Sequence, residues 1–358
     1  GFQDKTGGDT SVTPTKITCP SGSGTCYQVV ITRRVPLYLS QIVGYTGDST
    51  LNGTSRMATT IAAKAVASAK VFYNYCLVGL GTTPNAGPGA GQNNVALNGN
   101  GGDFTQCAAR SNGQVKCTAV DFAIIQAPSE QGATCGSDYA SASNSFTDPY
   151  ASKNVTSLIA NTMASAPACS ASVPATITAA VTVICSTTAA LGQNTTISQT
   201  DPANPPIIIV NNTTFNLNGH TLTTATGSTA TIIFTGPGTS GLPDWFSGDG
   251  SVTIQGANGG TYDDFSIIND PKYTTTAAFN PGGGSHFVLD VLGTVYVPNT
   301  DVVIQGSMNS TIGSRSCVSI IAKSIYVNGG SLDNDPLDCV ALGFDLAQTQ
   351  VARQTLVL

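Results

Sequence analysis

The sequence predicts a mainly β protein, a right-handed parallel β-helix-like solenoid preceded by a small α/β module. The chain beyond Cys76 consists of short β-branched or apolar bursts, and each burst is ended by Gly, Asn or Pro. No helix of two full turns is predicted between these bursts. Strands of about three to five residues at such close spacing are typical of stacked solenoid rungs, whereas sandwich strands are longer and lie roughly 8 to 12 residues apart.

The bursts that predict strands share this composition along the chain. In order they are Val95–Leu97, Phe122–Ile125, Ile207–Val210, Thr214–Leu217, Thr231–Phe234, Ser251–Ile254, Phe265–Ile268, Phe287–Leu289, Thr294–Val297, Val302–Ile304, Val318–Ile321 and Ser324–Val327. Related endings occur at Asn216–Gly219, Val303–Gly306 and Tyr326–Gly330. In each ending, an inward apolar residue and a polar residue precede a Gly that can turn a corner with φ > 0, which favours a solenoid further.

The first module is predicted to occupy residues 1–70. Its segment Cys26–Val35 is β-branched and alternates in its first half, which indicates a strand that the following proline ends. The segment Thr50–Ala69 is ambiguous, because its alanines favour a helix whereas Met57–Ile61 alternates and no charged helix face is present. We expect a strand that begins near Ser49.

The second domain is predicted to span residues 71–358. Residues 134–174 are rich in Ser, Ala, Asn and Pro, so we expect a long excursion or wrapping loop there. After the last rung, apolar residues alternate again at Val351 and in Leu356–Leu358. We therefore expect Thr349–Leu358 to return as a strand against the first module.

Composition excludes several classes of protein. The chain has 14 Lys and Arg against 20 Asp and Glu, a formal charge of −6, and charged residues make up only 9% of it. So few cations, scattered over this length, do not supply the basic face that nucleic acid requires, and no nucleic-acid partner is expected. An apolar content of 41% excludes a disordered chain. No stretch approaches the roughly 18 apolar residues of a membrane span.

The ten cysteines, an even number, are expected to form disulfides in an oxidising compartment. No Cys-x-x-Cys pair is present, and no histidine lies at a zinc-ligand spacing from a cysteine. Three predicted pairs close short turn-rich segments, namely Cys19–Cys26, Cys107–Cys117 and Cys317–Cys339. Two further pairs follow by elimination, namely Cys169–Cys185 and Cys76–Cys135. The expected location is extracytoplasmic: the periplasm, the cell surface or the medium.

Several motifs resemble one known family. Tyr27–Gly44, followed by the small-residue segment Ala58–Ala63, resembles the periplasmic part of TadG-like proteins of the tight-adherence (Tad/Flp) pilus system. Cys76–Leu80 and Asp148–Ala151 resemble motifs in the middle of these proteins. The tail is similar to the "G-T-I-Y-x-P … C … I-x-A-K-x-I … G" stretch of longer members at Leu292–Asn299, Val303–Gly306, Cys317–Ile325 and Asn328–Ser331. The resemblance thus touches most of the chain.

The resemblance implies a bacterial envelope protein with an amino-terminal membrane helix, a small α/β module and a β-rich domain displayed outside the cytoplasm. No such helix and no export leader follows Gly1, so we expect that the anchor was cleaved off or lies upstream. The implied partners are other pilus or envelope proteins, or further copies of this chain as an oligomer or filament. Membrane contact is expected only through the missing helix.

Polysaccharide-cleaving β-helices supply the main enzymatic alternative, because they hold several carboxylates and a base on one face. Asp263, Asp264 and Asp270 form the best candidate cluster. Adjacent residues of a strand point to opposite faces, however, and no basic motif is near these residues in the sequence. His220 and His286 lie at predicted corners, where we expect structural hydrogen bonds. No catalytic residue is therefore assigned.

Two further groups are weak candidates for binding. Asp333, Asp335 and Asp338 could gather oxygen ligands for calcium, but they lack the Gly and Glu of an EF-hand loop, and turns that use Asp side chains explain them better. Neither a metal nor a cofactor is predicted. Trp245, the single tryptophan, and its neighbour Phe246 are candidates for contact with a sugar or a partner, or for covering an exposed rung.

The sequence therefore favours a non-enzymatic surface or pilus-associated protein that acts in pilus assembly, adhesion or surface display. The low charge and the abundant Thr and Asn suit stable display outside the cell. A polysaccharide-active β-helix enzyme is the first alternative, and two carboxylates about 5 to 9 Å apart beside a basic residue in a cleft would favour it. A self-assembling filament subunit is the second, because open solenoid ends recruit strands from neighbours.

Overall fold

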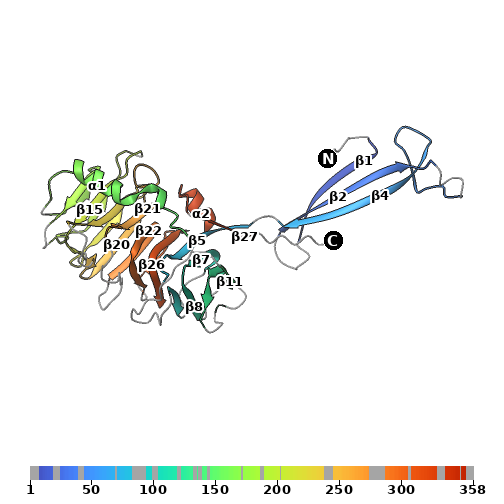
Figure 1. Cartoon of the computed structure of the whole chain (residues 1–358). Helices are drawn as coiled ribbons and strands as arrows, with labels where there is room; N and C mark the ends of the chain where they lie inside the picture. The colour runs from blue at the N-terminus through green and yellow to red at the C-terminus, as the bar shows by residue number, and fades with distance from the viewer. Residues whose placement is uncertain are drawn as a thin grey trace. The chain divides into compact units, whose positions relative to one another are not determined.

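The computed structural model divides the chain into two compact units: unit 1 comprises Gly1–Phe72 with Gln350–Leu358, and unit 2 comprises Tyr73–Thr349 (Figure 1). Unit 1 has a small antiparallel sheet and unit 2 a large sheet of parallel strands, so the protein is mainly β. The structure describes residues 8–18, 25–38, 44–68, 71–82, 94–98, 104–118, 122–131, 135, 139–142, 146–170, 172–185, 189–201, 203–237, 245–273, 287–304, 308–328, 335–346 and 348–351.

Unit 1 is an antiparallel sheet with the strand order β1-β2-β4-β3. Its strands are β1 (Thr10–Thr18), β2 (Thr25–Pro36), β3 (Ser49–Thr50) and β4 (Met57–Ser68). The ambiguous Ala-rich segment is thus mostly strand, because β4 pairs with β2 along its whole length and this ladder outweighs the helix propensity of alanine. The described residues of unit 1 form strands and no helix, so the α/β character expected of this module is not found in them.

Unit 2 contains most of the strands. The first group is β5 (Val71–Gly79), β6 (Val95–Asn98), β7 (Phe104–Ser111), β8 (Gln114–Thr118), β9 (Phe122–Ala127), β10 (Ser129–Glu130) and β11 (Tyr139–Ser141). A short 3-10 helix, η3 (Ala151–Lys153), and an α-helix, α1 (Val155–Ser165), come next. The second group is β12 (Thr176–Ile177), β13 (Val181–Ile184), β14 (Thr195–Ile197), β15 (Ile207–Asn211), β16 (Phe215–Asn216), β17 (Thr221–Thr224), β18 (Thr231–Thr235), β19 (Phe246–Ser247), β20 (Gly250–Gln255), β21 (Phe265–Asn269) and β22 (Phe287–Ile304). The last elements are β23 (Met308–Asn309), β24 (Thr311–Ile312), β25 (Arg315–Ser316), β26 (Val318–Asn328), α2 (Pro336–Ala341) and β27 (Gln348–Val351).

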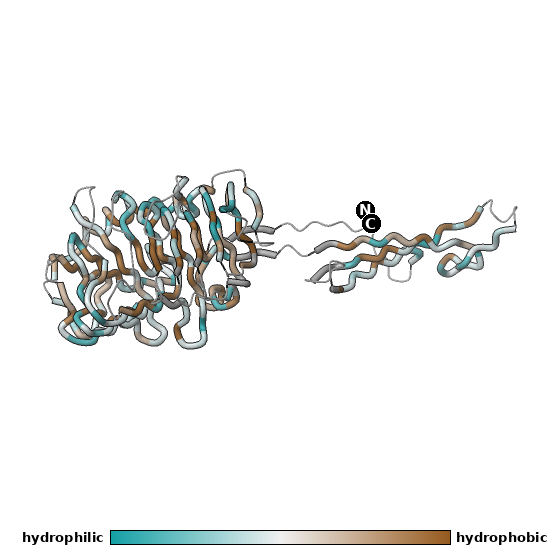
Figure 2. The backbone as a smooth tube through the Cα atoms, turned by 90° about the horizontal axis from the view of Figure 1, so that it is seen from below, coloured by the Kyte–Doolittle hydropathy of each residue, from teal (hydrophilic) through white to brown (hydrophobic). Residues whose placement is uncertain are grey.

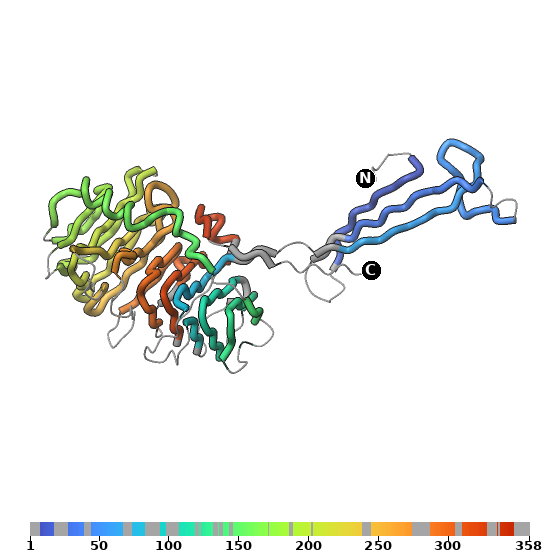
Figure 3. The backbone as a smooth tube through the Cα atoms, in the orientation of Figure 1, coloured from blue at the N-terminus to red at the C-terminus, as the bar shows by residue number. Residues whose placement is uncertain are grey.

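The strands of unit 2 stack in an order that differs from their order in the chain. The longest run of parallel pairs is β13-β15-β18-β21-β22-β26-β5-β7-β9-β11. At its middle, β26 pairs with β5, and Ile320 lies opposite Leu77. The chain therefore begins unit 2 in the middle of the stack, winds to the β11 end, crosses through α1 to the β13 end and winds back to the middle (Figure 3).

Two shorter runs of parallel pairs, β12-β14-β17-β20-β22-β23 and β26-β6-β8-β10, lie beside the longest one. Strand β22 belongs to two runs because it bends: Phe287–Leu292 pairs with β20, and Thr294–Tyr296 pairs with β21. Gly293 at the bend has a φ of 104°, and an added Cβ would lie 3.2 Å from the carbonyl oxygen of Asp264. This position therefore requires glycine.

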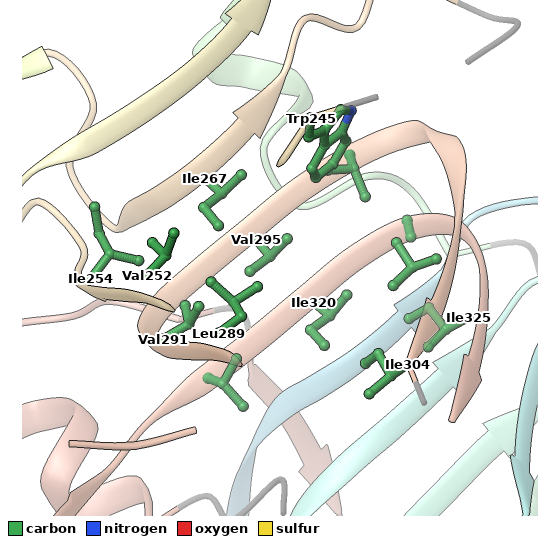
Figure 4. Packing of buried hydrophobic residues seen from close by; sticks show 14 of the residues in the cluster. Trp245, Val252, Ile254, Ile267, Leu289, Val291, Val295, Ile304, Ile320 and Ile325 are labelled. Atoms are coloured by element: carbon green, nitrogen blue, oxygen red, sulfur yellow. The ribbon is translucent and has the colours of Figure 1, made fainter. Parts of the chain in front are cut away.

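Apolar side chains fill the interior of unit 2. Val252, Ile267, Leu289, Val295 and Ile320 come from successive strands, point toward one another and are fully buried (Figure 4). The hydrophobic residues of unit 2 are concentrated on its strands and the hydrophilic ones on the connections (Figure 2). Every burst predicted from the sequence overlaps a strand, although β16 covers just Phe215–Asn216 of the burst Thr214–Leu217. Buried parallel strands favour β-branched apolar residues, which makes the bursts recognisable.

Four disulfides join described residues: Cys76–Cys107, Cys117–Cys135, Cys169–Cys185 and Cys317–Cys339. The predictions of Cys169–Cys185 and Cys317–Cys339 are confirmed. The predicted pairs Cys107–Cys117 and Cys76–Cys135 are wrong, because parallel stacking of β5 on β7 brings Cys76 beside Cys107 instead. The predicted pair Cys19–Cys26 lies outside the described residues.

The disulfides indicate an oxidising, extracytoplasmic environment. Each of them joins segments close in the sequence, with separations of 16 to 31 residues. Within the described ranges, no helix has the length and apolar character that crossing a membrane requires.

Candidate functional site

A segment that we call the strap, residues 146–170, lies over the outer face of the longest run of strands. It contains η3 and α1 and connects the β11 end of the stack to the β13 end. The sequence predicts an excursion here but misses the 11-residue helix α1. Val155 and Ile159, one turn apart, are buried on the side of α1 that faces the sheet. The small and polar residues around this short apolar stripe conceal it in the sequence.

The strap packs on outward-facing side chains from most strands of the run. Tyr150, Val155 and Ile159 share one buried cluster with residues of β5, β7, β13, β15, β18, β21, β22 and β26. Those side chains, with one from the turn before β21, are Tyr75, Val78, Ala108, Val183, Ile209, Ile233, Tyr262, Phe265, Ile268, Tyr296 and Ile321. The cluster therefore links strands that come early in the sequence, such as β5 and β7, to strands that come late, such as β22 and β26.

An ion pair between a half-buried lysine and a buried aspartate anchors the strap. The Nζ of Lys153 lies 3.3 Å from Oδ2 of Asp264 and donates to the carbonyl oxygen of Asp263 at 2.9 Å. It also lies 5.2 Å from the ring centroid of Tyr150. The Asp264 side chain is 3% exposed, and its Oδ1 accepts the backbone N–H of Asp345 at 2.8 Å. Both oxygens of this carboxylate are therefore held by groups of the protein.

Two tyrosines fix the beginning of the strap. The Tyr150 hydroxyl is hydrogen-bonded to Oγ1 of Thr294 at 3.1 Å, and the Tyr296 hydroxyl donates to Oδ2 of Asp148 at 2.6 Å. Burial raises the pKa of both phenols, and carboxylates raise it further, Asp264 for Tyr150 and Asp148 for Tyr296. Both phenols therefore stay protonated at physiological pH and do not serve as bases.

Asp263 is the half-buried member of the adjacent pair. Burial raises the pKa of its carboxyl, the charge of Asp264 raises it further, and the charge of Lys153 opposes the rise. No basic motif lies near Asp263 and Asp264 in the sequence, but the fold brings Lys153 against them. Lys153 comes from a segment 110 residues earlier in the chain, which no local motif could indicate.

A groove of about 410 Å³ runs along one side of α1. Polar side chains from both of its walls include Asn161, Thr162, Asn204, Thr231 and Tyr262. The Tyr262 hydroxyl is hydrogen-bonded to Oγ1 of Thr162 at 2.8 Å. The described lining of this groove contains amides and hydroxyls but no charged side chain, which would suit an uncharged ligand rich in hydroxyl groups.

A second groove, of about 350 Å³, runs along the opposite side of α1. Asp270, Lys272 and Thr235 contribute to its lining. The Nζ of Lys272 lies 3.3 Å from Oδ2 of Asp270, which also accepts the hydroxyl of Thr235 at 2.7 Å. The remaining oxygen, Oδ1, accepts the backbone N–H of Lys272 at 3.1 Å. Asp270 is 1% exposed, so this carboxylate also has internal partners for both oxygens.

Trp245 and Phe246 lie in and against the core of unit 2. Trp245 is 3% exposed and stacks on Phe234 with ring centroids 5.2 Å apart. Phe246 is half-buried, and its ring lies 5.5 Å from that of Phe287. Trp245 therefore fills the interior and presents no open ring face to a sugar, which leaves the covering of a rung as the better interpretation of this pair.

The remaining candidates have structural partners. Asp335 caps α2 by accepting the N–H of Leu337 at 2.8 Å, and Asp338 accepts the N–H of Ser316 at 2.9 Å. His220 follows a turn in which Gly219 has a φ of 79°, as a corner requires. His286 and Asp333 lie outside the described residues. Over the described ranges, no group of three or more His, Cys, Asp or Glu side chains is placed to hold a metal ion.

Sequence reasoning missed the residues that anchor the strap, above all Lys153, Tyr150 and Tyr296. The available signal was Asp148–Ala151, which stood out for its family resemblance and not for a role. A tyrosine and a lysine within a loop of small residues are the side chains able to reach a sheet and hold to it. Comparisons with protein-family models, curated proteins and solved structures find no match to this chain.

Proposed function

We propose that this chain is a non-enzymatic protein of the bacterial cell envelope that acts in pilus assembly, adhesion or surface display, as its resemblance to TadG-like proteins implies. The observation that carries the proposal is that the buried carboxylates are paired with lysines inside the fold. Asp264 pairs with Lys153, and Asp270 pairs with Lys272, so these carboxylates stabilise the fold. The disulfides and the low content of charged residues support a location outside the cytoplasm.

Unit 2 in this proposal is a right-handed parallel β-helix-like solenoid. The parallel runs, the bend of β22 at Gly293 and the continuous apolar interior support it. Each rung of such a stack is stabilised mainly by its neighbours. The stack therefore suits a passive, durable display element that keeps its shape without a bound cofactor.

The route of the chain supports display as well. Unit 2 begins at β5 and ends shortly after β26, and these strands are paired. The chain therefore enters and leaves unit 2 near the middle of the longest run of strands and not at its ends. Cys117–Cys135 lies toward the β11 end and Cys169–Cys185 toward the β13 end, so covalent links stabilise the regions most prone to fraying.

The enzymatic alternative has one observation in its favour, the base Lys153 beside Asp263 and Asp264. A glycosidase needs two carboxyl groups that both reach the sugar or the attacking water. Asp264 has a 3% exposed side chain and internal partners for both oxygens, so it does not meet that need. We therefore place this function second.

The test uses cells of the source bacterium. Antibodies against unit 2 should label intact cells without permeabilisation, and deletion of the gene should reduce attachment to surfaces. Complementation with wild type and with the variant Asp263→Asn should restore attachment equally. Label that needs permeabilisation, or purified chain that cleaves a polysaccharide in an Asp263-dependent way, would overturn the proposal.

A further inference from the structure

The cations of this chain are concentrated in unit 1. Unit 1 holds eight of the 14 Lys and Arg and three of the 20 Asp and Glu, a formal charge of +5. Unit 2 holds the other six cations and 17 acidic residues, a formal charge of −11. The total of −6 conceals this separation, so the expectation of scattered cations is wrong. The two units carry opposite charges large enough to guide association.

One face of the unit 1 sheet is apolar, and the described side chains on it are half-buried or exposed. The register places Val12, Ile31 and Ala63 in one row, and Pro14, Val29 and Ala65 in a second row on the same face. We define the apolar face as the side chains Val12, Pro14, Val29, Ile31, Val35 and Ile61. Ile61 is 56% exposed, although a sheet normally buries its apolar face against another layer.

The described residues of unit 1 do not supply that layer. Ala58 and Val66 are the buried ones among them, and both project from the opposite face of the sheet. Lys16 and Arg33 project from the apolar face, are exposed, and lie toward its two ends. The face is therefore apolar along its middle with a cation near each end, which fits an apolar partner that carries acidic groups at its margins.

Helix α2 of unit 2 has that character. Leu337 is 77% exposed and Val340 is 68% exposed, and the two lie one turn apart on the outer side of the helix. The opposite side of α2 is fixed, because Cys339 is buried and forms a disulfide with Cys317. We call residues 335–346 the knob. Its acidic residues are Asp335, Asp338 and Asp345.

We propose that the apolar face of unit 1 in one copy binds the knob of a second copy, so that copies join head to tail. A helix laid on the sheet covers Leu337, Val340 and Ile61 together. The acidic margins of the knob then lie near Lys16 and Arg33. Because the two surfaces differ, the contact is heterologous, and its repetition produces open chains of copies. The expected strand Thr349–Leu358 does not cover this face in the described residues: its described part, β27, belongs to the large sheet of unit 2, and residues 352–358 lie outside the described ranges.

This inference deepens the proposed role in assembly by naming the partner, a second copy of the chain. The test is sedimentation velocity of the purified full chain with its disulfides intact, over a range of concentrations. Average mass should rise with concentration, and raising the salt from roughly 0.05 M to 0.5 M should weaken association, because screening reduces the attraction between opposite charges. If the purified chain does not self-associate while intact cells are still labelled at their surface, this inference is rejected and the proposed function stands.

Two variants remove one surface each. Leu337→Ser with Val340→Ser alters the knob, and Ile61→Ser with Arg33→Glu alters the apolar face; all four residues are exposed, so folding should persist. Each variant should raise the concentration needed for association by at least about tenfold. An equimolar mixture of the two variants should form dimers and nothing longer, because each copy keeps one intact surface.

Matched controls are Val288→Ser, at an exposed apolar residue of β22, and Lys116→Glu, at a cation of β8; both residues lie outside the knob. Both controls should associate as the wild type does. A monomer at every concentration, or association that ignores both surface variants, would overturn the proposal. So would binding of anionic phospholipid vesicles or of heparin that depends on Ile61 and Arg33 without self-association, since the face would then serve a membrane or a polyanion.

Discussion

Lys153 and Asp264, 111 residues apart in the sequence, lie 3.3 Å apart and join the strap to the corner where β22 bends. The carbonyl oxygen of Asp264 accepts the N–H of Thr294 directly after the bend, and its Oδ1 accepts the N–H of Asp345. One aspartate thus connects the strap, the sheet and the segment that follows α2. Its backbone has a φ of 77°, which asparagine and aspartate tolerate better than other side chains.

Replacing Lys153 with methionine should destabilise unit 2. The variant leaves the Asp264 carboxylate buried without its cation, although the 31% exposure of the Lys153 side chain lets water replace part of the lost interaction. We expect a loss of about 2 kcal/mol in the free energy of unfolding, below the roughly 3 to 5 kcal/mol typical of a fully buried pair. Chemical denaturation followed by circular dichroism measures this loss.

The control for this variant is Lys323→Met. Lys323 lies 3.6 Å from Asp301, but its side chain is 44% exposed, so its removal should change stability by less than about 1 kcal/mol. The double variant Lys153→Met with Asp264→Asn should lose less than the sum of the two single losses, because no buried charge is then left unpaired. Equal losses for Lys153→Met and Lys323→Met would contradict an anchoring role.

Asp263 should make stability depend on pH in the acid range. Its folded-state pKa is raised above the usual 3.8 by burial and by the charge of Asp264. The folded state therefore binds this proton more tightly than the unfolded state does. Its contribution to stability is fully present below the unfolded pKa and is lost as the pH rises through the folded value. The variant Asp263→Asn should therefore have a higher Tm than wild type at neutral pH.

Thermal unfolding of wild type and Asp263→Asn across the acid range provides an internal control. The difference in Tm should shrink as the pH falls, because Asp263 of the wild type is then protonated and resembles asparagine in charge. A lower Tm for Asp263→Asn at neutral pH would show that the carboxylate stabilises the fold, and a difference independent of pH would show that the titration of Asp263 is not its cause.

Local patterns in the sequence predict which residues form the strands of unit 2, but they do not predict which strands lie side by side. Ile207–Val210 and Val318–Ile321 are recognisable because a buried strand needs β-branched apolar residues wherever it lies. The pairing of β26 with β5, by contrast, depends on a contact between Ile320 and Leu77 that no local pattern encodes. Lys153 and Asp264 are hidden for the same reason, since each has its partner on a distant segment.

The same limit explains the errors in cysteine pairing. The prediction of Cys107–Cys117 assumes that cysteines at the two ends of a short turn-rich segment are neighbours in space, as Cys317 and Cys339 are. The wrong pair Cys76–Cys135 then follows by elimination. Neighbouring strands of the longest run, such as β5 and β7, are separated in the sequence by another strand and its connections, and a cysteine therefore meets its partner across that distance. Cys76 and Cys107, 31 residues apart, follow this rule.

Peptide mapping under non-reducing conditions should recover peptides that link Cys76 to Cys107 and Cys117 to Cys135. Replacing both Cys76 and Cys107 with alanine should lower the free energy of unfolding by about 3 to 4 kcal/mol, because the unfolded chain regains the freedom of the closed loop. Linked peptides that join Cys107 to Cys117 would contradict the stacking of β5 on β7.

Trp245 reports on the interior of unit 2 because it is the single tryptophan and is 3% exposed. Its emission should be blue-shifted and weakly quenched by iodide in the folded protein, and both properties should change sharply on unfolding. Adding polysaccharides should leave the emission unchanged, since the ring stacks on Phe234 inside the fold.

Trp245→Ala should lower the free energy of unfolding by about 3 to 5 kcal/mol, the range for removing a large buried aromatic side chain. Trp245→Phe should lose less, because it keeps an aromatic ring against Phe234. Strong quenching in the native state, or an alanine variant as stable as wild type, would place the ring at the surface and restore its candidacy as a sugar contact.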